Sequence, residues 1–244
     1  MKVPGKKIYV WTRDLPDPVS KPAFVTEVFF GVSTYVTAFL TAKHPFRRGS
    51  VCPFVALALK KNGIFYTYVD EERESDAIKR VLECMERYLE LKFAAESNFS
   101  SMIILFRKEF PIRSLLKIQN DCKEACVNRN LMIGALYPKN PSPSLNSKTY
   151  FPLRTPSPVI VLRDLTAVDL LFLHTSRYSL KKRMTFLTAF IKRFGAVNSG
   201  TAWQQVEIAK RLMRTYRIRF FIGSAAVAGI FAVLGIGVSH AILK

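Results

Sequence analysis

Apolar residues recur with two different periods between residues 63 and 164, and the two periods alternate along the chain. Residues 70–96 and the segment after Pro111 carry apolar residues at helical spacing, with charged residues opposite. Four short apolar runs are typical of strands: GIFYTYV at 63–69, SSMIILF at 100–106, LMIGALY at 131–137 and PVIVLRD at 158–164. The order strand, helix, strand, helix, strand, strand predicts an α+β domain. Its sheet is expected to be mostly antiparallel, with four or slightly more strands and with helices packed on one face.

A further apolar run, PAFVTEVFFGVSTYVTAFLTA, occupies residues 22–42. It contains Glu27 and several hydroxyl side chains, and its apolar residues follow helical spacing. It is interpreted as an amphipathic helix on the core, with a membrane-associated helix as the alternative. After residue 164 the pattern is helical again, and a last helix is expected from about Thr201 to Arg219.

The segment from Phe220 to Leu243 contains 24 consecutive residues without a formal charge. A helix of that length can cross a hydrocarbon core of about 30 Å, because it rises about 1.5 Å per residue. Five Lys/Arg precede it at 210–219, and positive residues flank the cytoplasmic side of a span. The sequence therefore predicts a tail-anchored, single-pass membrane protein with a cytoplasmic N-terminal domain. A buried helix of the domain is the alternative.

The predicted organisation has four parts. They are an N-terminal extension at 1–21, a cytosolic α+β domain at 22–200, a basic juxtamembrane helix at 201–219 and a transmembrane helix at 220–243. Within the span, Ser224, Ala228 and Ala232 recur every four residues, and small residues let a second helix approach closely. A homo-oligomer formed through 224–236 is therefore a further expectation.

The net charge of +19 would suit a polyanionic partner, but the charge is local. Residues 177–219 hold eleven Lys/Arg and one acidic residue, Glu207, whereas residues 70–96 hold nine Asp/Glu and five Lys/Arg. Because the positive charge collects beside the predicted span, anionic lipid headgroups are the expected partner of 210–219. Nucleic acid is not expected, since no recognition motif is visible.

Candidate chemistry gathers in one stretch, AKHPFRRGSVCPFVALALKKNG at 42–63. Arg47 and Arg48, at a turn that opens a helix, would bind a carboxylate or phosphate; the alternative is solvated surface charge. Cys52 is a nucleophile, a haem thiolate or a buried small side chain. His44 lies beside them. No Walker loop, HExxH, GxSxG or CxxC pair is present, so the sequence does not decide whether the protein is an enzyme.

The Pro/Ser/Asn-rich loop at 138–158 is long for a plain connection. With Arg154 in it and Arg163 after it, the loop either covers a pocket or is a surface excursion. No metal site is predicted. Cys122 and Cys126 are interpreted as buried small residues, because no further ligand completes a four-ligand set nearby, and a reducing compartment is expected.

Several segments in order resemble an uncharacterised bacterial domain family with HPxRxGxVCPF and PLRSPxP motifs: HPFRRGSVCPFVALAL, MIILFRKEFP, NLMIGALYP, FPLRTPSPVIVLRDLTAVDLLFL and FIKRFG. The resemblance covers roughly residues 40–200 and implies no particular activity. More distantly, VCPFVALAL is similar to a motif of the haem-dependent guanidine and amine N-oxygenases of the guanitoxin-biosynthesis type. That similarity implies a haem beside Cys52 and Pro53, with His44 or Cys52 as axial ligand.

Two functional hypotheses follow from the sequence. In the first, the domain of a tail-anchored protein binds a small molecule or cofactor in a pocket built from 44–54 and 138–163. It would then act as a haem-dependent oxygenase-like enzyme on an amino- or guanidino-bearing metabolite. In the second, the protein is a non-enzymatic membrane sensor, effector or complex subunit that oligomerises through its transmembrane helix.

Overall fold

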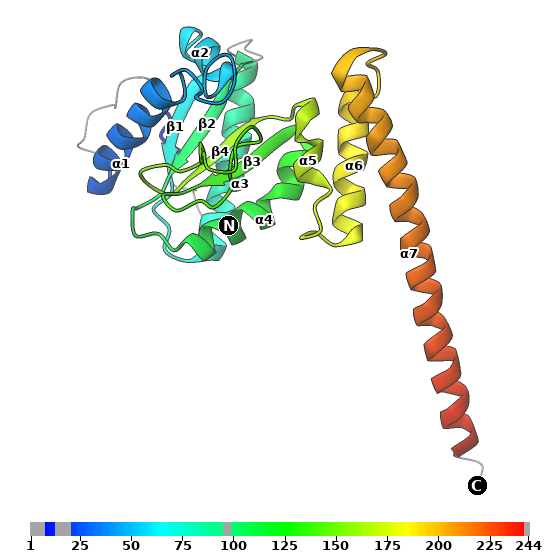
Figure 1. Ribbon diagram of the computed structural model, residues 1–244. Helices are drawn as coiled ribbons and strands as arrows, with labels where there is room; N and C mark the ends of the chain where they lie inside the picture. The colour runs from blue at the N-terminus through cyan, green and yellow to red at the C-terminus, as the bar shows by residue number, and fades with distance from the viewer. Residues whose placement is uncertain (1–7, 13–20, 95–98, 242–244) are drawn as a thin grey trace. The chain divides into compact units, whose positions relative to one another are not determined.

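The computed structural model describes residues 8–12, 21–94 and 99–241, and for residue 94 and residues 223–241 it describes the helical backbone only. The chain divides into two compact units, Met1–Leu165 and Thr166–Lys244. In Figure 1 the colour runs along the chain from blue at the N-terminus to red at the C-terminus. The first unit contains the sheet. The second consists of helices.

The sheet of the first unit has four strands in the order β1-β2-β4-β3. β1 and β2 are parallel, and β4 is antiparallel to both of its neighbours. The bounds are Ile64–Tyr68 for β1, Ser101–Leu105 for β2, Leu131–Leu136 for β3 and Val159–Asp164 for β4. The predicted α+β class and four strands are confirmed, but the sheet is mixed. A helix between β1 and β2 returns the chain to the same end of the sheet, which makes these two strands parallel.

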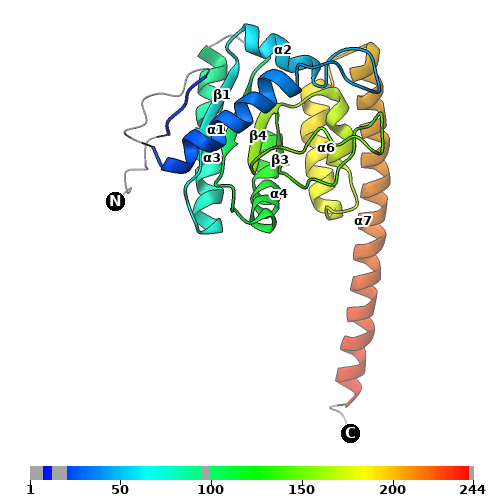
Figure 2. The same ribbon diagram turned by 60° about the vertical axis from the view of Figure 1, so that its left-hand side comes forward.

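Helices cover both faces of the sheet, so the expectation of helices on one face is wrong. Helices α3 (Glu74–Ala94) and α4 (Ile112–Asn128) pack on one face. The other face is covered by α1 (Ala23–Thr34), the π-helix η2 (Tyr35–Phe39) and α2 (Pro53–Lys60). Figures 1 and 2 show the two helical layers on either side of the strands. The strands are apolar on both sides because each side is buried.

Trp11 belongs to this core although it lies far from the sheet in sequence. Its backbone pairs with β1, with Trp11 N–H donating to the Tyr66 carbonyl at 3.1 Å and Tyr66 N–H donating to the Trp11 carbonyl at 2.8 Å. The indole is 5% exposed. It stands edge-on to Phe29 at 5.7 Å and stacks on Tyr66 at 6.3 Å between ring centroids. The residue therefore fixes this segment to the free edge of β1.

The second unit contains a 3-10 turn η3 (Ala167–Asp169) and the helices α5 (Leu170–Leu173), α6 (Leu180–Phe194) and α7 (Gly200–Ala241). Ser179 caps α6, because its hydroxyl accepts from the Lys182 N–H. Helices α6 and α7 pack side by side (Figure 1). The buried residues of α7 recur every three or four positions and so share one side: Val206, Ala209, Met213 and Tyr216.

The predicted transmembrane helix is not supported. Among the residues that the structure describes, no helix has both the length and the apolar character needed to cross a membrane. The transmembrane helix at 220–243, the tail anchor and the single-pass localisation with a cytoplasmic N-terminal domain are therefore wrong. The same correction applies to the membrane-sensor alternative.

The sequence interpretation joined a helix at 201–219 to the charge-free run that follows it, and the structure has one continuous helix there. In the structure, α7 begins at Gly200 and passes position 220 without a break, so the run continues a helix with one glutamate and five Lys/Arg. Its first turns pack on α6. The end of the predicted span and its side chains beyond Ile222 lie outside the described residues. The oligomer contact expected at 224–236 lies there too and stays a prediction.

Candidate functional site

The helix over the sheet changes from α to π geometry at Tyr35. Three threonine hydroxyls, two in this helix and one just after it, donate to carbonyls four residues earlier: Thr34 to Phe30 at 2.9 Å, Thr37 to Ser33 at 2.8 Å and Thr41 to Thr37 at 2.5 Å. Such bonds compete with the backbone ladder and distort a helix. Short π-helical segments often occur at functional sites.

A cavity of about 320 Å³ opens on one side of this distorted segment. Its lining comes from the Trp11 segment, the α1–η2 helix, the end of α2 and the first half of β1. The lining residues are Thr12, Ser33, Thr37, Leu59, Asn62, Ile64 and Tyr66. None of these side chains carries a formal charge. The cavity therefore offers hydroxyl and amide groups on an apolar wall.

The polar groups of the cavity are held in place by the surrounding fold. Burial raises the pKa of Tyr66 to about 12 and outweighs a hydrogen bond with Ser33, which lowers the pKa. The phenol therefore stays neutral at physiological pH. Asn62 has a φ of +50° and ends α2 in the left-handed conformation. The next N–H, of Gly63, donates to the Ala58 carbonyl at 2.8 Å and closes that helix end.

A buried donor without a partner lies behind the cavity wall. The Trp11 ring stacks on Tyr66, which lines the cavity. The Trp11 Nε1–H is buried and has no hydrogen-bond partner among the described residues. A buried unsatisfied N–H costs about 1–3 kcal/mol. An acceptor near this edge would relieve that cost.

The stretch singled out by the sequence, 42–54, folds as a tight hairpin followed by α2. His44 N–H donates to the Gly49 carbonyl at 2.9 Å, and Gly49 has a φ of +88°, which favours glycine. The Arg47 guanidinium donates to three carbonyls of this hairpin, those of Arg48 at 2.9 Å, Ser50 at 2.6 Å and Val51 at 3.0 Å. Arg47 thus holds the hairpin, while Arg48 is exposed.

His44 is buried, and both ring nitrogens face protein groups. Nδ1 accepts from the Phe46 N–H at 3.0 Å, so the proton of the neutral ring is on Nε2, which lies 3.4 Å from Ser144 Oγ. The ring is edge-on to Tyr150 at 5.0 Å. A haem iron would need a free nitrogen lone pair, and the Nε2–H tautomer offers none without losing the bond from Phe46.

The loop at 138–158 packs on this stretch. The Tyr35 hydroxyl donates to the Pro152 carbonyl at 2.5 Å. Burial, and secondly the nearby Cys52 and Tyr150, raise the pKa of Tyr35. Arg154 donates from Nε to the Asn140 carbonyl at 3.1 Å and covers the Phe151 ring at 3.9 Å. The structure therefore brings His44, Cys52 and the loop together, and Arg154 braces the loop from within.

Arg163 lies at the other end of β4. It pairs with Ser101 and Met132, the beginnings of β2 and β3, whereas the loop at 138–158 joins β4 at Val159. Its guanidinium donates to the Asp164 carbonyl at 2.8 Å. Sequence reasoning grouped Arg163 with the loop because it follows the loop, but β4 carries Arg163 away from the end at which the loop joins the strand.

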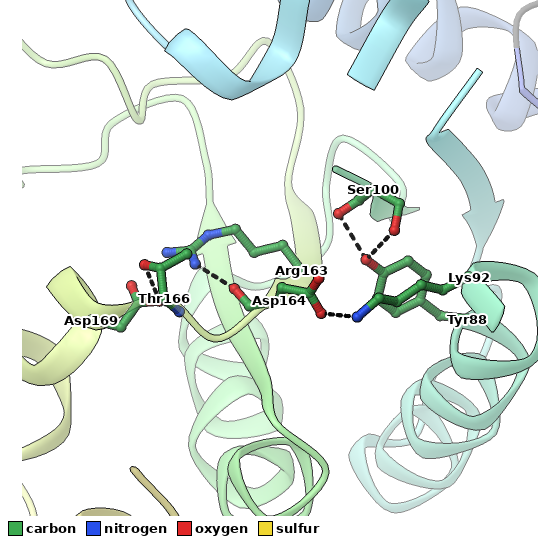
Figure 3. A network of polar contacts seen from close by, with 7 residues as sticks. All are labelled: Tyr88, Lys92, Ser100, Arg163, Asp164, Thr166 and Asp169. Carbon is green, nitrogen blue, oxygen red and sulfur yellow. Dashed lines mark hydrogen bonds and ion pairs between the residues drawn. The ribbon is translucent and has the colours of Figure 1, made fainter. Parts of the chain in front are cut away.

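The surroundings of Arg163 form a structural network (Figure 3). Asp164 forms an ion pair with Lys92 of α3. The Tyr88 hydroxyl, one turn earlier on α3, donates to the Ser100 carbonyl at 2.7 Å and contacts Ser100 Oγ at 3.0 Å. These contacts hold α3 against the sheet. Within the second unit, Thr166 N–H and hydroxyl both donate to Asp169 Oδ2, at 2.8 and 2.9 Å, and form a capping box.

Sequence reasoning missed the cavity residues because none of them belongs to a catalytic motif. One signal was available: Ser33, Thr34, Thr37 and Thr41 interrupt a helix that is otherwise strongly apolar. The cysteines behave as expected. Cys122 and Cys126 are buried, and burial raises the pKa of each thiol to about 12. The described residues contain no group of three or more His, Cys, Asp and Glu arranged to hold a metal ion.

The buried His44 makes a testable contribution to pH-dependent stability. Burial, and secondly the nearby Arg47, lower its pKa. The unfolded chain, with a histidine pKa of about 6.5, therefore binds more protons as the pH falls below that value. The stabilisation is present above this pKa and is lost as the pH falls through it toward the folded value.

We expect the free energy of unfolding of the wild-type chain to fall more steeply than that of His44→Asn between about pH 8 and pH 5. The asparagine oxygen can accept the Phe46 N–H but does not titrate. Urea unfolding followed by circular dichroism at several pH values measures the difference. Parallel pH profiles for the two chains would contradict the assignment of a buried, neutral His44.

The first unit is thus a four-stranded α+β domain with helices on both faces and an uncharged polar cavity at its β1 edge. The family described as domain of unknown function DUF6875 has a model that matches residues 30–205, and the chain belongs to this family. The predicted membership of an uncharacterised domain family is confirmed to this extent. The quoted motifs and the oxygenase similarity stay predictions. Neither a curated protein nor a solved structure matches the chain.

Proposed function

We propose that the first unit binds a small, uncharged, polar molecule in the cavity between η2, α2 and β1. The observation that carries the proposal is the lining: four hydroxyl side chains and one amide around two aliphatic ones. Ligand sites are commonly apolar cavities of about 300–1,000 Å³ with a few converging polar groups. The cavity of about 320 Å³ is at the small end of this range, which suits a molecule the size of a monosaccharide or a nucleobase.

The lining also indicates which ligands the cavity disfavours. A charged ligand would lose its hydration without gaining an opposite charge, since the cavity residues are neutral. Tyr66 is the titratable side chain among them, and its raised pKa makes it a hydrogen-bond donor rather than a base. These features support binding of a neutral ligand more than acid–base catalysis. We therefore place ligand recognition ahead of an enzymatic role.

The geometry does not favour a haem here. The cavity lining contains no histidine or cysteine, and His44 keeps its lone pair for the Phe46 N–H. The function proposed for the first unit thus differs from the oxygenase-like hypothesis in both site and ligand.

The proposal is tested with a matched pair of threonines on one helix. Thr34 and Thr37 are both exposed, and both hydroxyls donate to a carbonyl four residues earlier. Only Thr37 of the two lines the cavity. Thr37→Leu removes a hydroxyl and fills part of the cavity, whereas Thr34→Leu changes the same chemistry outside it.

A library of neutral sugars, nucleosides and amides is screened by saturation-transfer NMR against the wild-type chain. We expect hits whose affinity falls about tenfold or more in Thr37→Leu. The variant removes roughly one hydrogen bond to the ligand and fills part of the space that the ligand occupies. Thr34→Leu should bind them as the wild type does. Hits that respond equally to both variants, or an absence of hits, would overturn the proposal.

A further inference from the structure

The second unit carries an excess of positive charge that its own acidic groups do not offset. Residues 177–219 contain eleven Lys/Arg and the single acid Glu207. The sequence interpretation expected anionic lipid headgroups as the partner of 210–219, beside the predicted span, and this partner stays a prediction. The exposed groups of this part of the chain also suit a different polyanion.

Part of this charge forms a row on α7. Lys210, Arg214 and Arg217 are separated by four and three residues, so they share one side of the helix. All three are exposed. The buried residues of α7, from Val206 to Tyr216, mark a different side, which packs on α6. At about 1.5 Å per residue the row is about 10 Å long.

The row keeps most of its charge available. Lys210 pairs with Glu207 at 2.8 Å, but Arg214 and Arg217 form no ion pair with any residue that the structure describes. Helix α3 of the first unit differs, because its Arg80 and Arg87 pair with glutamates three residues on. Arg214 and Arg217 thus offer two guanidinium groups, whose forked donors match the geometry of phosphate oxygens.

An aromatic residue extends the row at its N-terminal end. Trp203 lies seven residues before Lys210, two turns earlier on the same side of α7, and is 45% exposed. Nucleic-acid bases stack on such side chains, with about 1–3 kcal/mol per base. In a duplex the base faces are already stacked, so an exposed indole beside a cationic row fits a single strand better.

We propose that this side of α7, formed by Trp203, Lys210, Arg214 and Arg217, binds single-stranded nucleic acid. The three cations contact the phosphate backbone, and the indole stacks on a base. Binding is expected to be largely independent of sequence, because it uses phosphate contacts and base stacking. The inference does not depend on the cavity of the first unit, since it uses residues of the second unit only.

The first test measures the salt dependence of binding by the full chain. A fluorescein-labelled dT 20-mer is titrated, and anisotropy is followed at several salt concentrations. Three phosphate contacts predict a slope of about −2 in log K against log salt, at about −0.7 per contact. The double variant Arg214→Gln/Arg217→Gln should bring the slope to about −0.7. Arg87→Gln, an exposed arginine on α3, is the control and should leave it unchanged.

The second test uses the two tryptophans of the chain as probes. Trp203 is exposed and Trp11 is buried, so added oligonucleotide should quench the Trp203 emission by stacking. Trp203→Leu should remove the quenching and lower the affinity by about tenfold, while leaving the salt slope in place. Thermal unfolding followed by circular dichroism confirms that each variant is folded.

Three results would overturn the inference. They are a flat salt dependence, an affinity that does not respond to the Arg214/Arg217 double variant, and oligonucleotide binding that leaves Trp203 emission unchanged. Vesicles that contain anionic lipid test whether this row of residues binds a lipid surface instead. A blue shift of Trp203 emission on such vesicles, without oligonucleotide binding, would assign the row to a lipid surface and contradict the proposal.

Discussion

Replacing Trp11 with alanine is expected to lower the free energy of unfolding by about 3–5 kcal/mol, as truncating a buried aromatic does. The indole is 5% exposed and packs on Phe29 and Tyr66 from the free edge of β1. The loss combines the buried area, the aromatic contacts and the space left behind, which the surrounding core fills only in part. Urea unfolding followed by circular dichroism measures it.

The other tryptophan of the chain is the matched control. Trp203 is 45% exposed on α7, so Trp203→Ala should change the free energy of unfolding much less, by about 0.5 kcal/mol. Similar effects for the two variants, or a loss below about 1 kcal/mol for Trp11→Ala, would contradict the packing of the N-terminal segment on β1.

Gly63→Ala is expected to destabilise the first unit by about 1–3 kcal/mol or more through overpacking. A Cβ at Gly63 would lie 2.5 Å from the backbone carbonyl oxygen of Phe99. Both sides of this contact are held: Gly63 N–H donates to Ala58, and the Gly63 carbonyl accepts from Ser101 at 2.9 Å. Because the clash is with backbone, no side-chain rotation relieves it. Thermal and urea unfolding report the loss.

Gly134 provides the control within the same sheet. A Cβ there would meet only Leu136 Cδ1, at 3.8 Å, which is ordinary contact. Gly134→Ala should therefore be neutral or stabilise slightly, since alanine reduces the freedom of the unfolded chain by up to about 1 kcal/mol. Equal losses for the two variants would contradict the clash with the Phe99 carbonyl as the cause of the loss at Gly63.

Much of the first unit could be predicted from the sequence because its signals are local. Four strands and two helices were placed to within a few residues, since period and turn residues mark them directly. The parallel pairing of β1 and β2 and the second helical layer depend on contacts between distant segments. Trp11 illustrates this limit: nothing near residue 11 indicates that it completes the edge of a strand more than fifty residues later.

The transmembrane prediction is wrong as well. It was drawn from the absence of charge over 220–243, whereas among the residues that the structure describes no helix is both long and apolar enough to cross a membrane. The candidate site was missed for a different reason. Reactive residue types drew attention to His44, Arg47 and Cys52, and the first two are engaged by their own loop. The cavity is lined by residue types that carry no catalytic signature, so only their spatial convergence reveals it.

The most direct test of the central claim is a crystal structure of the chain with a neutral polar fragment selected by the NMR screen. Our account predicts density for the fragment in the cavity, hydrogen-bonded to Thr37, Asn62 or Tyr66. A fragment bound instead against His44, Cys52 and the loop at 138–158, with the cavity left unchanged, would contradict it. That result would return the site to the stretch that the sequence first indicated.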